Sequence, residues 1–385
     1  MTQILYDFGT GRSDPETFPT DALKAAALAV LDREGEALTR YPGSLGHEGM
    51  RRAMARREAQ REGVEVDPDH VVLCNGSMQA VTLTAEALQE AHGDTVIVEE
   101  FSYPGTLGAY RSLKYEMVGV PLDEGGMQMD ALEDTLATLQ REKRLPRFIY
   151  AISTYQNPTG FVMPRARRLE MIALARRYGV PIVEDNCYAD VHYEGEEVPA
   201  IYALDDDPNH LYLCSLSKIL APGFRLGYVL ARPPMLERIL ERRHDAGANT
   251  FAAAVVAEFY RNGIGDHAHT TNSLLRVKRD LTLELLGEHL EDICAWSSPA
   301  GGLFIWVRLP EDVDRKALWD SCQAAGVNYL PGASFHYQTR NKPYLRLAFG
   351  HLTTDQIAAG IPILARCVQG ARSSNEARRF EGLFD

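Results

Sequence analysis

The alternation of short apolar runs with longer segments of helical period, between about residues 70 and 232, is the strongest constraint on the fold of this chain. The runs are rich in β-branched residues, and the segments between them are long enough for helices. Parallel strands need such crossover connections, so the pattern is typical of a sheet covered by helices. Seven runs qualify as strands: 70–75, 95–100, 115–122, 147–154, 181–186, 211–216 and 225–231. The sequence predicts an α/β fold with a mainly parallel seven-stranded sheet.

A second, smaller unit is expected, because 385 residues exceed what one compact core usually holds. Residues 234–292 are predicted to be helical, and strand-like runs at 300–310, 327–332 and 344–350 precede a helix at 354–370. The chain starts with an arm and a helix, so we expect a small α+β domain made from both chain ends. The predicted boundaries are 1–45 (arm and helix, part of the small domain), 46–285 (large domain with the seven-stranded sheet) and 286–385 (small C-terminal domain).

Charge, cysteine spacing and hydropathy argue against several classes of protein. The net charge of -13 argues against a nucleic-acid partner, since phosphate binding needs a basic face. The six cysteines contain no C-x-x-C pair, so neither a metal site nor a disulfide framework is predicted. The start of the chain lacks a signal-peptide pattern, and no window is long and apolar enough for a membrane span. A cytoplasmic protein is expected.

Lys218 is the first candidate for chemistry. Ser215 and Ser217 precede it at the end of a strand-like run, and Arg225 follows it. Most lysines are solvated surface charges. In a dry pocket, however, a lysine amine has a lowered pKa and can form a Schiff base with a carbonyl. The other strand ends decide between these alternatives, because ligands gather at the carboxyl ends of parallel strands.

Two strand ends offer groups for a flat, phosphorylated ligand. Gly76 and Ser77 follow a strand and open a helix, where free backbone N–H groups and the helix dipole suit a phosphate. Tyr103 follows the next strand, where its ring could stack on a flat ligand. Each feature is also common without function, since serine caps many helices and a tyrosine in a turn often only packs.

Two further strand ends carry an amide and a carboxylate. Asn157 follows the run 147–154 in an Asn-Pro-Thr-Gly turn, which needs no function but could aim the amide at a ligand oxygen. Asp185 ends an apolar strand, so its carboxylate must pair with a structural cation or a protonated ring nitrogen. Tyr188 lies three residues further on. With Lys218, these groups match what pyridoxal phosphate (PLP) needs, namely an amine for the Schiff base and an acid for the pyridine nitrogen.

Seven motifs, in order along nearly the whole chain, carry a family resemblance: "YPGSLG", "NGS", "SYPG", "NPTG", "EDNCY", "SLSK" with its following arginine, and "YLRLAFG". The chain resembles the fold-type I, class I/II aminotransferases that depend on PLP. Through the N-terminal "GTGRSDPETFP" it is most similar to the branch of aminoadipate and kynurenine aminotransferases and MocR-type effector domains.

The resemblance implies roles for the residues around the cofactor ring. Lys218 would form the internal aldimine and then move the proton between the substrate Cα and the cofactor. Asp185 would pair with the pyridine nitrogen and stay ionised. Tyr188 and Asn157 would bond the phenolate oxygen of the ring, and Tyr103 would stack on its face.

The resemblance also implies a phosphate site and a homodimer. The phosphate would be held by Gly76, Ser77, Ser215, Ser217 and Arg225. Tyr41 would reach the phosphate of the neighbouring subunit, so the site would need a homodimer. Met78 stands where relatives often carry Gln, which replaces one polar cofactor contact by a thioether.

On the substrate side, the resemblance implies that Arg346 clamps the α-carboxylate in a bidentate pair, with Asn157 assisting. Arg12 in the arm could pair with the distal carboxylate of glutamate or aminoadipate, although an arm arginine is more often solvated. His336 and Tyr329 lie near these motifs without an assignable role. Asn186 and Cys187, which stand where relatives often carry Asp or Glu and then Pro, leave the substrate open.

The activity expected from the resemblance is transamination between an L-amino acid and a 2-oxo acid, with pyridoxamine phosphate as the intermediate form of the cofactor. Another PLP-dependent reaction, such as elimination, cyclisation or decarboxylation, uses the same cofactor motifs and stays open. A regulator that only senses the cofactor or an amino acid is a further alternative, although the chain begins at the arm and shows no basic winged-helix module.

Overall fold

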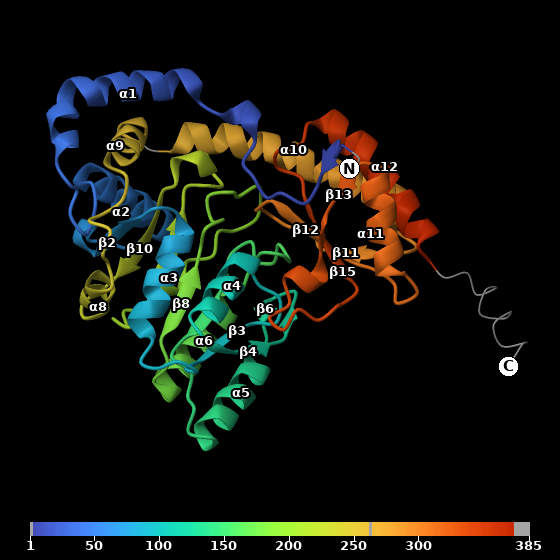
Figure 1. Ribbon diagram of the computed structural model, residues 1–385, viewed down its shortest axis with the longest axis horizontal. Coiled ribbons are helices and arrows are strands. Elements are labelled where there is room, and N and C mark those ends of the chain that lie inside the picture. Colours follow the sequence, from blue (N-terminus) through green and yellow to red (C-terminus); the bar gives the residue numbers. More distant parts are fainter. Residues whose placement is uncertain (1–2, 262–263, 373–385) are drawn as a thin grey trace, which may run out of the picture.

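The computed structural model describes residues 3–261 and 264–372 and contains the predicted large sheet (Figure 1). The strand order is β2-β10-β9-β8-β7-β3-β4. Their bounds are β2 Val71–Cys74, β10 Gly227–Ala231, β9 Leu211–Ser215, β8 Ile182–Asp185, β7 Ile149–Ala151, β3 Thr95–Glu99 and β4 Glu116–Val120. Only β10 is antiparallel to its neighbours. The predicted mainly parallel seven-stranded sheet is therefore confirmed.

Helices cover both faces of this sheet, because alternate residues of each strand point to opposite faces. On β9, Leu211 and Leu213 belong to one core cluster, while Tyr212 and Cys214 belong to another. The first face packs against α3 (Ser77–Leu88), α4 (Pro104–Ser112) and α8 (Met235–Glu241). The second packs against α2 (Glu48–Glu62), α5 (Met129–Arg141), α6 (Arg165–Tyr178) and α9 (Thr250–Phe259). The minor elements of this part are α7 (Ile201–Leu204), β5 (Leu122–Asp123) and β6 (Gly126–Met127).

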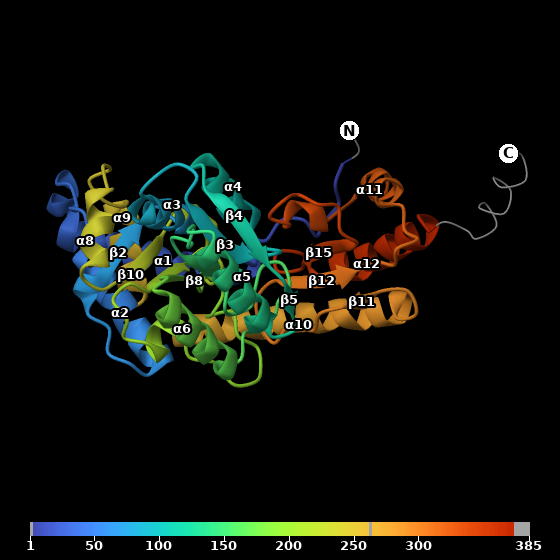
Figure 2. The ribbon, with the colours of Figure 1, turned by 90° about the horizontal axis from the view of Figure 1, so that it is seen from below.

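The second unit is a four-stranded antiparallel sheet with helices, as expected for an α+β domain. Its strand order is β11 (Ala295–Trp296), β12 (Phe304–Arg308), β15 (Tyr344–Ala348) and β14 (Leu330–Pro331). Helices α11 (Arg315–Ala324) and α12 (Thr354–Gly370) pack with it, and α12 begins at a capping box formed by Thr353 and Gln356. The long helix α10 (Gly265–Leu290) runs from the large sheet to this unit (Figures 1 and 2).

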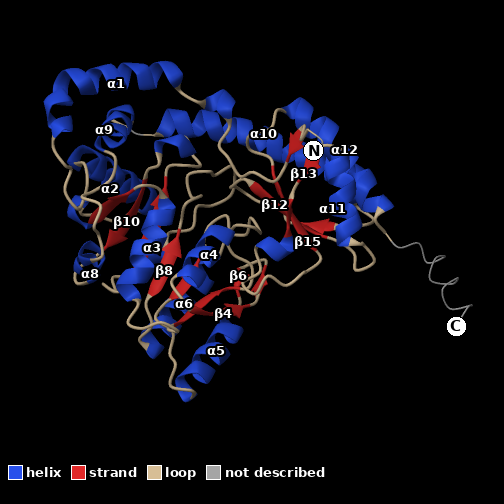
Figure 3. Cartoon of the chain, viewed as in Figure 1, coloured by secondary structure: helices blue, strands red, loops and turns tan. Residues whose placement is uncertain are grey.

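The N-terminal segment contacts both units. Strand β1 (Tyr6–Asp7) pairs with β13 (Val327–Asn328) of the small unit, which fits a small domain made from both chain ends. Helix α1 (Thr20–Glu34), by contrast, packs against α9 of the large unit through Leu23 and Val30 (Figure 3). The predicted domain boundaries stay a prediction, and the part of the predicted small domain beyond residue 372 lies outside the described residues.

None of the helices within residues 3–261 and 264–372 is long and apolar enough to cross a membrane.

Candidate functional site

Asp185 is the last residue of β8 and is buried at the carboxyl end of the large sheet. Its carboxylate accepts hydrogen bonds from the Tyr150 hydroxyl at 2.7 Å and the Cys187 backbone N–H at 3.2 Å. Burial raises the pKa of Asp185, and these bonds oppose that shift. No cationic side chain pairs with it among the described residues. A buried carboxylate in this state suits a ligand that brings its own positive charge.

Lys218 lies just beyond the end of β9 and is only partly exposed. Its Nζ donates a hydrogen bond to the Gly11 carbonyl oxygen at 2.7 Å and lies 6.0 Å from the centre of the Tyr188 ring. Burial lowers the pKa of Lys218 to about 8, and the positive charges of Arg346 and Arg225 contribute to the lowering. A substantial fraction of the amine is therefore neutral near physiological pH, as a nucleophilic lysine requires.

The predicted phosphate-binding residues come together at the start of α3. Gly76 precedes this helix with φ of 87°, and a Cβ placed on it would lie 2.4 Å from Arg225 Nη2. Ser217 approaches from the β9 side, where its Oγ accepts from the Ser215 hydroxyl at 3.0 Å. The structure thus gathers an arginine, two hydroxyls and a helix N-terminus around Ser77, which is the chemistry of a phosphate cradle.

Asn157 joins Arg346 to Tyr188. Its Nδ2 donates to the Tyr188 hydroxyl at 3.0 Å, and its Oδ1 accepts from Arg346 Nη1, also at 3.0 Å. The second terminal nitrogen of Arg346 donates to the Gly9 carbonyl, whereas its buried Nε has no partner among the described residues. The guanidinium carbon lies 4.2 Å from the centre of the Phe304 ring, and burial lowers the pKa of Arg346 to about 10. The fork remains cationic at neutral pH and keeps free N–H groups for a carboxylate.

Tyr103 and Met78 lie at the edge of this cluster. Tyr103 immediately precedes α4, and its pKa is raised by burial and by the nearby charge of Asp185. Met78 is half-buried in the first turn of α3 and packs against the core on that face of the sheet.

Four residues considered from the sequence lie apart from the cluster. Tyr41 is 88% exposed, so it lies outside the cluster in this chain. The Arg12 side chain is 55% exposed, and its Nη2 lies 4.0 Å from Asp7 Oδ2. His336 is buried with Nε2 3.4 Å from Glu100, and Tyr329 packs against Trp319 in the small unit.

Sequence reasoning did not single out several groups that support the site. The carbonyls of Gly9 and Gly11 contact Arg346 and Lys218, but backbone acceptors have no sequence signature. Glu99, at the end of β3, accepts from the Gln156 side chain at 3.1 Å and so holds the residue before Asn157. Its position at a strand end was a usable signal. Burial raises the pKa of Glu99 to about 8.

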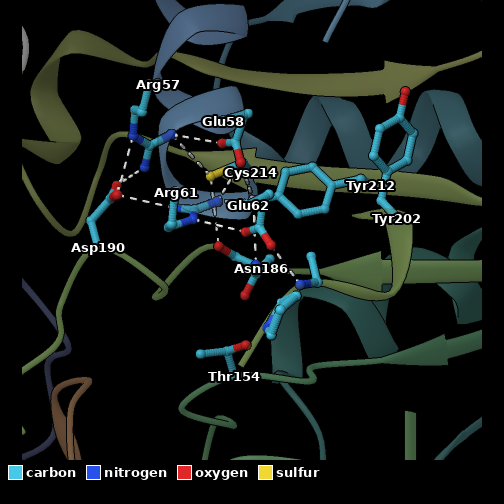
Figure 4. A network of polar contacts seen from close by, with 12 residues as sticks. Arg57, Glu58, Arg61, Glu62, Thr154, Asn186, Asp190, Tyr202, Tyr212 and Cys214 are labelled. Carbon is cyan, nitrogen blue, oxygen red and sulfur yellow. Dashed lines mark hydrogen bonds and ion pairs between the residues drawn. The ribbon is translucent and has the colours of Figure 1, made fainter. Parts of the chain in front are cut away.

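A second buried cluster lies on the α2 face of the sheet (Figure 4). Arg57 pairs with Glu58 and Asp190, and Arg61 pairs with Glu58 at one nitrogen and with Asp190 at 3.0 Å through another. The Tyr212 hydroxyl donates to Glu58 at 3.0 Å. All these charges are paired with one another. Asp190 lies in the turn that follows β8 and carries Tyr188, so the network fixes the segment next to Asp185.

Comparison with known proteins agrees with this geometry. Residues 6–362 match the family described as "Aminotransferase class I and II". The chain is 33% identical over 96% of its length, and 89% of the relative's, to the aromatic-amino-acid aminotransferase 1 of Thermococcus litoralis. It is 29% identical to the 2-aminoadipate transaminase of Thermus thermophilus, over 95% of this chain and 90% of that one. A multiple substrate aminotransferase from Thermococcus profundus has a TM-score of 0.91 at 32% identity, covering 98% of this chain and 93% of that chain.

The predicted branch is also confirmed, since relatives include a kynurenine/alpha-aminoadipate aminotransferase and HTH-type transcriptional regulators. The site fits PLP on its own chemistry, because a buried carboxylate without a cation, a lysine of lowered pKa and a phosphate cradle lie together at the strand ends. The chain therefore belongs to the class I and II aminotransferases, and it is a PLP-dependent transaminase.

Proposed function

We propose that the enzyme transfers amino groups between L-amino acids and 2-oxo acids with the residues of this cluster in the following roles. Bound PLP supplies an electron sink for the bonds at the substrate Cα. Lys218 would hold the cofactor through its amine and would carry the proton at the substrate Cα. Asp185 keeps the pyridine nitrogen protonated, and a cation at that position lowers the pKa that burial has raised.

Residues around these two groups orient the cofactor and the substrate. The amide of Asn157 and the hydroxyl of Tyr188 hold the phenolate oxygen, while Tyr103 and Met78 contact the ring side of the site. The α3 N-terminus, with Arg225, Ser215 and Ser217, holds the phosphate. Arg346 binds the α-carboxylate. The observation that carries this proposal is that Asp185 and Arg346 are buried, beside Lys218, without ion-pair partners among the described residues.

For the substrate class, we propose aromatic L-amino acids as the preferred donors. Phe304 and Phe335 line the Arg346 guanidinium, with ring centres 4.2 and 5.0 Å away. The relatives named for aromatic amino acids and for multiple substrates support this choice. A dicarboxylic donor would have to draw Arg12 away from Asp7.

A panel of amino donors tests the substrate proposal. Phenylalanine, tyrosine, glutamate, 2-aminoadipate and alanine are each offered with one oxo acid acceptor, and kcat/KM is measured. We expect the aromatic donors to give the highest values and Arg12→Ala to leave them unchanged. A preference for glutamate or 2-aminoadipate that Arg12→Ala abolishes would contradict the proposal and assign Arg12 to substrate recognition.

We further propose a homodimer in which Tyr41 reaches the phosphate site of the neighbouring subunit. Its exposure of 88% and the exposed apolar side chains Leu28, Leu31 and Phe251 support such an interface. Mixing Tyr41→Phe with Lys218→Ala subunits tests it. If each site is built from both subunits, the mixed dimer contains one site with neither substitution and one site with both. The mixture should then be more active than either variant alone.

The six cysteines are all free thiols, which supports a reducing compartment, and we propose the cytoplasm. Fractionation of cells that express the protein tests this location.

A further inference from the structure

The N-terminal arm crosses the site and contacts two of its positively charged groups, Lys218 and Arg346. The Gly11 carbonyl accepts from Lys218 at 2.7 Å, and the Gly9 carbonyl accepts from Arg346. Together with Asn157, the arm therefore uses two of the five N–H groups of Arg346 and leaves the others for a ligand. An arginine held at two points presents its remaining donors in a fixed direction, which favours bidentate binding of a carboxylate.

The arm is packed too closely to shift without a change at its ends. A Cβ on Gly11 would lie 2.7 Å from the Phe304 ring, and a Cβ on Gly350 would lie 2.9 Å from the Arg12 carbonyl oxygen. At its start, Asp7 accepts from the Thr10 hydroxyl at 2.6 Å and from Asn328 Nδ2 at 2.7 Å. These contacts hold one end of the arm on the small unit.

The other end is held by a buried ion pair. Lys278, in the middle of α10, donates to Asp14 Oδ2 at 2.5 Å, and the two side chains are 1% and 0% exposed. Among the described residues, Lys278 Nζ has no other hydrogen-bond acceptor. Asp14 also accepts from the Glu16 backbone N–H through Oδ1, where it caps a short helical turn (Pro15–Thr17). A buried pair of this kind joins two distant segments in one geometry, because separating the charges is costly.

We propose that the arm, residues 7–14, is part of the amino-acid site, and that Asp14 and Lys278 are positioning residues for it. The Gly9 carbonyl orients Arg346 for the substrate carboxylate, and the Gly11 carbonyl holds the Lys218 amine whenever that amine is free. The ion pair keeps both carbonyls in place although neither of its members touches the substrate. The inference rests on the proposed function, since it assigns Arg346 to the substrate carboxylate.

The test uses the PLP-loaded enzyme and 3-phenylpropionate, a carboxylate with neither an amino nor an oxo group. Its Kd and the Kd of PLP are measured by calorimetry for the wild type and for the double variant Asp14→Asn with Lys278→Met, which removes both charges at similar side-chain size. Gly11→Ala displaces the arm without changing any charge. It replaces the double variant in the test if the double variant does not fold. Glu194→Gln is the matched control. It removes the ion-pair partner of Arg276 and Arg279, which lie on the same helix as Lys278.

We expect the double variant and Gly11→Ala to bind 3-phenylpropionate about tenfold more weakly, as the loss of one charge-assisted contact implies. PLP affinity should stay within about twofold, and Glu194→Gln should match the wild type. Amide hydrogen exchange should rise in residues 8–13 of the double variant but not in α12.

Two results would overturn the inference: an unchanged Kd for 3-phenylpropionate in the folded variants, or an equal loss of PLP affinity, which would make the pair a general support of the fold. A wild type that binds neither PLP nor 3-phenylpropionate would instead remove the proposed function on which the inference rests.

Discussion

Two clusters of charge in this molecule are built differently. On the α2 face of the sheet, Arg57 and Arg61 are each paired with carboxylates of the same chain. At the carboxyl ends of β8 and β9, Asp185 and Lys218 lie near Arg346 of β15, yet none of the three has an ion-pair partner among the described residues. Unpaired buried charges are unfavourable, so a chain keeps them where a ligand completes the pairing. The first cluster is structural, and under the proposed function cofactor and substrate complete the second.

The largest effect is expected from Lys218→Ala, which removes the reactive amine from the cluster of Asp185, Lys218 and Arg346. Turnover should fall by roughly 10³-fold or more, because a covalent and acid–base group is lost. Folding and PLP binding should persist, since the phosphate cradle and Asp185 are untouched. Steady-state rates and a PLP titration check both parts. Near-normal turnover in this variant would refute the role of Lys218.

Breaking the paired cluster should act on stability instead. Arg57→Ala leaves the carboxylates of Glu58 and Asp190 without one partner in a buried site. The free energy of unfolding should fall by about 3–5 kcal/mol, measured by urea unfolding. Arg56→Ala, on the exposed face of the same helix, should change it by less than about 0.5 kcal/mol. Equal losses of unfolding free energy in the two variants would show that the ion pairs of Arg57 do not stabilise the fold.

Asp185→Asn tests the cluster of Asp185, Lys218 and Arg346, where we expect a loss of activity without a loss of stability. The substitution removes a charge that burial disfavours, so the cofactor-free protein should be no less stable than the wild type. With PLP bound, kcat should fall by roughly 10²–10³-fold, because the pyridine nitrogen loses its anionic partner. Thermal unfolding of the cofactor-free protein and steady-state kinetics measure the two effects. A large loss of stability with normal kcat would place Asp185 among the structural charges.

A pH-dependent effect is expected at Glu99, whose pKa burial raises from 4.5 to about 8. The folded protein therefore binds this proton more tightly than the unfolded chain does. Its stability contribution is fully present below pH 4.5 and is lost as the pH rises towards 8. Glu99→Gln does not titrate, so its stability relative to the wild type should rise by up to about 1.4 kcal/mol per pH unit over that window. Unfolding curves at pH 5 and pH 8 give the comparison. A constant difference would mean that Glu99 titrates near its ordinary pKa.

The fold could be predicted from the sequence because its main signals are local. The β-branched runs became the seven strands, and helix 354–370 begins and ends where its pattern indicated. The cofactor cluster was predictable for a related reason: Asp185 and Lys218 each follow a strand, and parallel strands bring their carboxyl ends together.

The remaining parts depend on distant segments that no local pattern connects. The Gly9 and Gly11 carbonyls are backbone groups, and their position depends on the Asp14–Lys278 pair, which spans 264 residues of sequence. From the sequence, Arg57 and Arg61 would be assigned to a solvated face of α2. In the structure they pack against the sheet, where Arg57 is buried and the Arg61 side chain is 11% exposed.

The most direct test of the account is the absorption spectrum of the purified protein, recorded before and after adding phenylalanine, with the oxo acid assayed in the same tube. We predict a band of lysine-bound cofactor that phenylalanine converts to the pyridoxamine phosphate spectrum, with an equal amount of oxo acid formed. No band after reconstitution with PLP, or a band that amino acids leave unchanged while no oxo acid forms, would contradict the account.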